Sequence, residues 1–122
     1  MTGGVFRLIA KLIHLKIIKK YGSVIFPYAK VGVGFQIVHP VGIVLGNCTI
    51  GDNFIIYQGC TVGVKADKHP PVIGNNVELC ANSLIIGNVH VVDNVVIGAH
   101  SLVIKDIVES GVYAGSPARK IK

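Results

Sequence analysis

Two histidines stand directly before prolines, in the pairs His39-Pro40 and His69-Pro70. A proline restricts the preceding residue to extended backbone angles, and this fixes the direction of that residue's side chain. Imidazole suits a general base that takes a proton from a hydroxyl group, because histidine ordinarily titrates near neutral pH. The residues alone leave His39 open between a base and a structural role, and they favour a functional role for His69.

Other chemistry has less support in the sequence. No glycine-rich elbow surrounds a serine, and neither a phosphate-binding loop nor a dinucleotide fingerprint is present. We expect no metal, because the short spacing of zinc-binding histidines is absent. The alternative is a metal site in which His39 and His69 join His90 or His100 across stacked coils. Otherwise we predict that His90 and His100 are exposed to solvent.

A six-residue repeat must position these histidines. From position 73 an aliphatic residue returns at every sixth place, and a small or branched residue follows four places after each. A period of six fits neither an α-helix nor an alternating strand, so each hexad is one short strand and one corner of a coil. The first set is Ile73, Leu79, Ile85, Val91, Ile97 and Val103, and the second is Val77, Ser83, Val89, Val95, Ser101 and Ile107. We predict an all-β coil with both sets facing inward and with Gly, Asn and Asp at its corners.

The repeat has two breaks, and each contains one of the His-Pro pairs. The frame slips by one residue between Ile37 and Ile50, over residues 39–46. A second break follows Val62 and ends at Ile73, so we predict an extruded loop over residues 64–72, of the kind that often carries binding residues. This loop contains Lys65, Asp67, Lys68 and His69.

Composition narrows the choice of partners and compartment. The 122 residues suffice for one domain with a continuous core, because 51% of them are hydrophobic. A net charge of +6 favours an anionic ligand such as a polyanionic cofactor, whereas the 7% of aromatic residues argues against nucleic acid. Cys48, Cys60 and Cys80 cannot all pair, so we expect reduced thiols and a cytoplasmic protein.

The N-terminal region, residues 1–22, has apolar residues at three- and four-residue spacing, which predicts an amphipathic helix over residues 4–20. Basic residues interrupt this segment too often for a membrane-spanning helix. The helix either caps the open end of the coil or lies peripherally on an anionic membrane surface. We place the coil at residues 23–111 and a C-terminal tail at residues 112–122.

Four parts of the chain together resemble one enzyme family, namely residues 37–46, residues 56–63, the Lys68-His69-Pro70 triplet and residues 114–119. They are similar to the serine acetyltransferase branch of the hexapeptide-repeat acyltransferases. The resemblance implies a left-handed parallel β-helix, an exception to the usual right-handed crossover. It also implies a homotrimer with active sites between neighbouring chains, and acetyl-CoA as the donor.

The same resemblance implies roles for individual residues. His39 matches the general base that deprotonates an acceptor hydroxyl, and His69 matches a second histidine that helps to bind the acceptor. We place Lys68 and Gln58 in the same substrate site. Small residues that match the lining of the pantetheine arm are Gly63, Ala81 and Ala99, and the basic candidates for the CoA phosphates are Lys105, Arg119 and Lys120.

Two departures from serine acetyltransferases concern the acceptor. Val24 occupies the position of the carboxylate that orients the catalytic histidine, and Val38 occupies that of an Asp that contacts serine. A neutral sugar needs hydrogen bonds rather than a counter-ion, so we predict that the acceptor is a sugar hydroxyl. The short chain with its basic helix is accordingly most similar to the short O-acetyltransferases of bacterial polysaccharide and capsule synthesis. The alternatives are a serine O-acetyltransferase acting on L-serine and a non-catalytic β-helix assembly protein.

Overall fold

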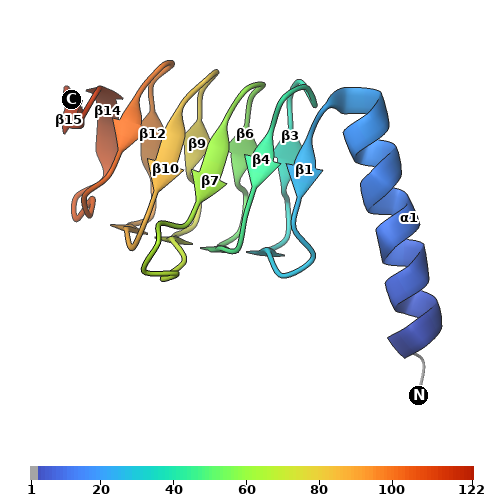
Figure 1. Cartoon of the computed structure of the whole chain (residues 1–122). Coiled ribbons are helices and arrows are strands. Elements are labelled where there is room, and N and C mark those ends of the chain that lie inside the picture. Colours follow the sequence, from blue (N-terminus) through green and yellow to red (C-terminus); the bar gives the residue numbers. More distant parts are fainter. Residues whose placement is uncertain (1–2) are drawn as a thin grey trace.

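The computed structural model describes residues 3–122, which form a parallel β-helix with one helix, α1 (Gly3–Tyr21), at its N-terminal end (Figure 1). Sheet A contains β1 (Val24–Ile25), β4 (Val44–Leu45), β7 (Thr61–Gly63), β10 (Leu84–Ile86) and β13 (Leu102–Val103). Sheet B contains β2 (Lys30–Val31), β5 (Thr49–Ile50), β8 (Val72–Ile73) and β11 (His90–Val91). Sheet C contains β3 (Gln36–Ile37), β6 (Ile55–Ile56), β9 (Glu78–Leu79), β12 (Val95–Ile97), β14 (Gly111–Gly115) and β15 (Ala118–Lys120). The predicted fold class is confirmed.

The core contains the two predicted inward sets, and eight buried residues between Ile43 and Val62 continue it through the earlier coils. Every member of both sets is buried, and none is more than 5% exposed. Each buried aliphatic side chain contributes about 1.5–3 kcal/mol, so the stack stabilises the β-helix strongly. The two buried serines are also satisfied, because the Ser83 hydroxyl donates to the Cys80 carbonyl at 2.6 Å and the Ser101 hydroxyl accepts from the Gly115 amide at 3.0 Å. The β-helix is therefore a firm support for its corners.

Each coil of the β-helix passes through sheets A, B and C in turn and so has three corners. We name these corners AB, BC and CA after the sheets that they connect. The BC corner carries a ladder of polar side chains. Asn53, Asn76 and Asn94 all have positive φ there, and the side-chain amide of each of the first two donates to the next residue of the ladder, at 3.1 and 3.2 Å. Beside them, the Asp52 amide donates to the Asn75 side chain at 2.8 Å. Asparagine tolerates the left-handed turn, and its side chain joins successive coils.

The first break in the repeat lies at the CA corner between β3 and β4. Ile37 is in register with Ile56, whereas Val44 is in register with Thr61. The connection through His39 is therefore two residues longer than the connection in the following coil. From the start of β4 to the start of β5 the chain is one residue shorter than from the start of β10 to the start of β11. Two extra residues before β4 and one fewer after it give the net slip of one residue that the sequence shows.

The second break lies at the AB corner between β7 and β8, where residues 64–71 form the loop. In Figure 1 this loop projects from the lower end of the sheet A strands, whereas the chain enters β1 at their upper end. The two breaks thus lie at opposite ends of sheet A. The sheet A strands have two or three residues, so at about 3.3 Å per residue they alone separate those ends by roughly 7–10 Å.

The two ends of the β-helix are closed differently. At the N-terminal end, α1 rests on the first coil through the half-buried His14, Ile17 and Tyr21. At the C-terminal end, β14 extends sheet C in parallel and β15 folds back antiparallel to it, so residues 112–122 form paired strands rather than a tail outside the repeat. Within residues 3–122, no helix combines the length and the apolar composition needed to cross a bilayer.

Candidate active site at the CA corner

His39 lies on a bulge of the CA corner and is exposed to solvent. The Val41 amide donates to the His39 carbonyl at 2.9 Å, and the Gly59 amide of the next coil donates to the Val41 carbonyl at 2.9 Å. Val41 thereby replaces His39 in the ladder between coils, and Gly42 closes the bulge with a φ of 66°. The bulge turns His39 and Pro40 outward without interrupting the stack beneath them.

Gln58 occupies the same corner in the next coil, where the ladder of backbone hydrogen bonds places it in register with Val41, two residues after His39. Its side-chain oxygen Oε1 is buried and has no hydrogen-bond partner within residues 3–122. A buried acceptor without a donor is costly, so this oxygen is suited to receive an N–H from the imidazole or from a ligand. Gln58 therefore offers an unpaired acceptor at the corner that also carries His39.

Two alanines continue the corner toward the C-terminus. The Asn82 amide donates to the Gln58 carbonyl at 2.9 Å, and the His100 amide donates to the Ala81 carbonyl at 3.0 Å, so Gln58, Ala81 and Ala99 are in register. Successive coils are about 4.8 Å apart. With side chains this small, the corner forms a low track that starts at His39 and can accept an extended chain against its backbone.

An acidic residue beside this corner was not identified from the sequence. Glu78 lies in β9, and a hydrogen bond from the Tyr57 hydroxyl to its carboxylate raises the pKa of Tyr57, an effect to which the charge of Glu78 adds. Burial, and then the same charge, raises the pKa of the neighbouring Cys80 thiol. Outward-facing positions of the hexad carry no periodic signal, so only the register between coils shows that these side chains meet.

The loop residues lie at the AB corner, away from His39 of the same chain. Lys68 adopts a φ of 62°, and the His69 amide donates to the Asp67 carboxylate at 3.2 Å, which fixes a tight turn at the loop. The His69 Nδ1 atom lies 4.0 Å from the same carboxylate, and its side chain is 68% exposed. Gly63 lies at this end of sheet A too, where an added Cβ would meet only an ordinary contact of 3.6 Å with Ile86.

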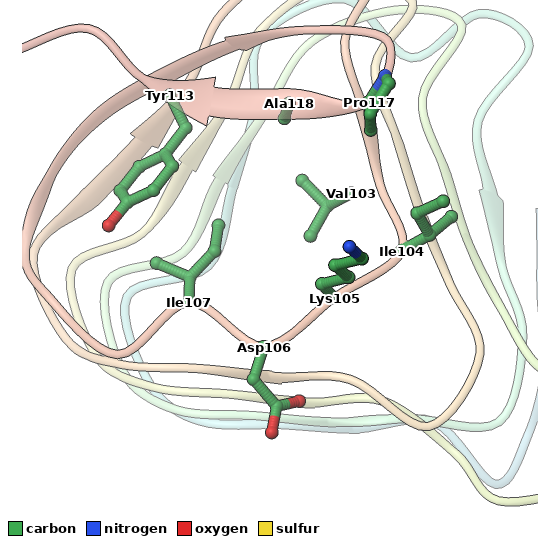
Figure 2. A pocket seen from close by; sticks show the side chains of 8 residues that line it. All are labelled: Val103, Ile104, Lys105, Asp106, Ile107, Tyr113, Pro117 and Ala118. Carbon is green, nitrogen blue, oxygen red and sulfur yellow. The ribbon is translucent and has the colours of Figure 1, made fainter.

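The three basic candidates divide between the corners. Lys105 follows β13 at the AB corner and lines a cavity of about 60 Å³ at the C-terminal end (Figure 2). Arg119 pairs with Ala114 of β14 near the CA corner, and among residues 3–122 it makes no ion pair. Lys120 is already engaged, because its Nζ atom donates to Glu109 at 2.9 Å. This bond lowers the pKa of Glu109 and raises that of Lys120. Arg119 is the freest of the three to meet an anion at the CA corner.

The prediction that His90 and His100 are exposed to solvent is confirmed. The three cysteines are free thiols. Cys48 and Cys60 are buried, and burial raises the pKa of Cys48 to about 11. In the described part of the chain, no group of three or more His, Cys, Asp and Glu side chains could hold a metal ion together.

Comparisons with known proteins point to one family. No protein-family model matches the chain. A serine acetyltransferase of Staphylococcus epidermidis is 42% identical over 106 residues, which are 83% of this chain and 49% of the relative, and one from Staphylococcus aureus is 40% identical over 105 residues. The chain thus spans about half the length of the curated relatives that it matches. Both relatives are named serine acetyltransferases rather than polysaccharide O-acetyltransferases.

Solved structures give the same result for the fold. The serine acetyltransferase of Neisseria gonorrhoeae superposes with a TM-score of 0.87 at 31% identity, over 94% of this chain and 47% of that one. A serine acetyltransferase in complex with CoA superposes with a TM-score of 0.82 at 33% identity, over 91% of this chain and 47% of that one.

Proposed function

We propose that this chain acts as an acetyl-CoA-dependent O-acetyltransferase of the serine acetyltransferase family, with His39 as its general base. The observation that carries the proposal is the placement of a bulged, exposed His39 at the head of a track of small residues. The similarity to a serine acetyltransferase whose structure contains CoA supports the choice of donor.

The residues at the corner account for the chemistry of acetyl transfer. An imidazole nitrogen of His39 accepts the proton of the acceptor hydroxyl while that oxygen attacks the thioester carbonyl carbon. A C–O bond forms, the C–S bond breaks, and the imidazolium returns the proton to the departing sulfur. General-base catalysis of this kind contributes about 10²–10⁴ in rate. The Oε1 atom of Gln58 can accept the other imidazole N–H and so hold the reacting nitrogen unprotonated.

The donor fits the same corner. Ala81 and Ala99 leave room for an extended pantetheine arm beside the backbone, and Arg119 offers a planar cation for a phosphate at the C-terminal end of the track. Binding of acetyl-CoA can be measured without turnover, by calorimetry. Saturable binding supports the enzyme, and its absence would favour the non-catalytic assembly protein.

We propose further that three chains complete each other's sites. Within one chain, His39 and His69 lie at opposite ends of sheet A. The outer face of that sheet is mostly apolar, since Val44, Leu84 and Leu102 point away from the core there, with Thr61 between Val44 and Leu84. In a closed ring, one edge of each chain meets the opposite edge of its neighbour. A homotrimer with sheet A toward the axis would therefore bring the loop of one chain to His39 of the next. Light scattering should then give three chains per particle.

For the acceptor, we favour L-serine over the sugar hydroxyl expected from the sequence. Relatives at 40% identity and above carry the name serine acetyltransferase, and one solved relative was obtained in complex with serine. Glu78 supplies an acid beside the corner that a substrate ammonium could pair with, in place of the carboxylates missing at Val24 and Val38. Those two valines are the observation that still favours a sugar as the second candidate.

A single assay separates the candidates. Release of the CoA thiol is followed with acetyl-CoA and either L-serine, nucleotide sugars or oligosaccharides as acceptor. We expect saturable turnover with L-serine, and we expect Glu78→Gln to raise the KM for serine about tenfold without changing that for acetyl-CoA, since an ion pair with the ammonium is lost. If only sugars were acetylated, and if Glu78→Gln had no effect on that activity, the acceptor would be a sugar rather than L-serine.

A further inference from the structure

Helix α1 leaves an apolar stripe uncovered on its side away from the coil. The half-buried His14, Ile17 and Tyr21 mark the side that contacts the first coil. At 3.6 residues per turn, the opposite side carries side chains spaced three and four residues apart. They are Val5, Leu8, Leu12 and Leu15, which are 66%, 60%, 55% and 59% exposed. We call these four residues the outward stripe. In Figure 1, α1 stands at the end of the β-helix with its long side uncovered.

The charge of the chain is concentrated on the same helix. Five of the 12 Lys and Arg residues, and none of the 6 Asp and Glu residues, lie in α1. On a helical wheel, Lys11 and Lys16 flank the outward stripe on its two sides, and Lys19 and Lys20 lie in the last turn. An occupant of this surface must offer apolar contact in the middle and negative charge at the margins.

We propose that the outward stripe docks on the surface of an anionic lipid bilayer. The apolar side chains would enter the boundary between headgroups and acyl chains, while the lysines extend their ammonium groups to lipid phosphates. A second copy of α1 fits less well, because pairing two such helices would bring ten cations together without one compensating acid. The proposal does not depend on the chemistry at the CA corner, which lies on the β-helix.

The test is flotation of the purified chain with vesicles of phosphatidylcholine alone or mixed with phosphatidylglycerol. We expect binding to the mixed vesicles only, weakened by salt because the attraction is partly electrostatic. Lys16→Glu should lower the bound fraction about tenfold or more, since a cation at the surface becomes an anion. Its matched control is Lys30→Glu, which makes the same charge change at an exposed position of β2 and should bind as the unaltered chain does.

Leu8→Glu tests the apolar half of the surface, and circular dichroism with thiol-release activity on a soluble acceptor shows whether this variant is folded. We expect Leu8→Glu to abolish flotation and to leave the fold and the activity unchanged. Three results would overturn the proposal. The first is that the chain binds equally to both kinds of vesicle. The second is that Lys16→Glu and Lys30→Glu lower the bound fraction equally. The third is that the chain self-associates without lipid and that Leu8→Glu removes this self-association.

Discussion

The BC and CA corners are built from the same repeat but use their polar groups differently. At the BC corner, each of Asn53 and Asn76 donates to the next asparagine along the axis. At the CA corner no such ladder runs along the axis in residues 3–122. Instead the corner carries a bulged His39, an unpaired Gln58 oxygen and small alanines. The first corner pairs its asparagine side chains along the axis, whereas the second leaves a buried Gln58 oxygen without a partner.

This difference shows how a regular β-helix can carry a candidate active site. The repeating positions stabilise the fold, because the polar groups of each coil form hydrogen bonds with those of the next coil. Function is expected where the repeat departs from its own rule, since a departure that exposes or orphans polar groups costs free energy. A substitution at the CA corner should therefore change the rate of the reaction, and a substitution at the BC corner should change the stability of the fold.

The largest effect is expected at the bulge. His39→Ala should lower kcat by about 10²–10⁴-fold, because the general base is lost, while thermal unfolding stays unchanged because the side chain is exposed. Steady-state thiol release and a melting curve measure the two quantities. His90→Ala, an exposed histidine on sheet B, serves as control and should keep full activity. If His39→Ala kept full activity, His39 would not be the general base.

His69→Ala should act on acceptor binding rather than on the chemical step. We expect the KM for the acceptor to rise about tenfold with a smaller change in kcat, since one hydrogen bond to a charged group is lost. The KM for acetyl-CoA should remain the same in two-substrate kinetics. If His69→Ala changed only acetyl-CoA binding, the loop would belong to the donor site instead.

A substitution at the BC corner should lower stability and leave activity unchanged, which is the opposite of the result expected for His39→Ala. Asn76→Ala removes two ladder hydrogen bonds and puts Ala at a φ of 56°, so we expect a loss of about 1–2 kcal/mol of unfolding free energy with kcat/KM unchanged. Asn76→Gly keeps the backbone angle accessible and should lose less. Denaturant unfolding measures both variants. A selective loss of activity in folded Asn76→Ala protein would contradict the division between corners.

The smallest effect is expected at the C-terminal end of the track. Arg119→Ala should raise the KM for acetyl-CoA about fivefold, since an exposed cation facing a phosphate contributes on the order of 1 kcal/mol. Lys120→Ala should change this KM less, because Lys120 is paired with Glu109. Calorimetric titration with CoA checks the order of the two variants. A larger effect from Lys120 would mean that its ion pair opens for the ligand.

Much of this organisation could be predicted from the sequence, because inward residues repeat. Both predicted inward sets are buried, and Asn76 and Asn94 make left-handed turns as their positions in the hexad suggest. Outward residues follow no period, so the contact of Tyr57 with Glu78 depends on a register that only the folded chain shows. The pairing of Lys120 with Glu109 was missed for a related reason, since it requires the reversal between β14 and β15.

The central claim is that the CA corner binds the donor with its sulfur beside His39. A crystal structure of the chain with bound CoA tests this most directly. We predict the pantetheine arm along Gln58, Ala81 and Ala99, with the thiol next to the imidazole of His39. CoA bound along the BC corner, or His39 facing bulk water away from the ligand, would contradict the account.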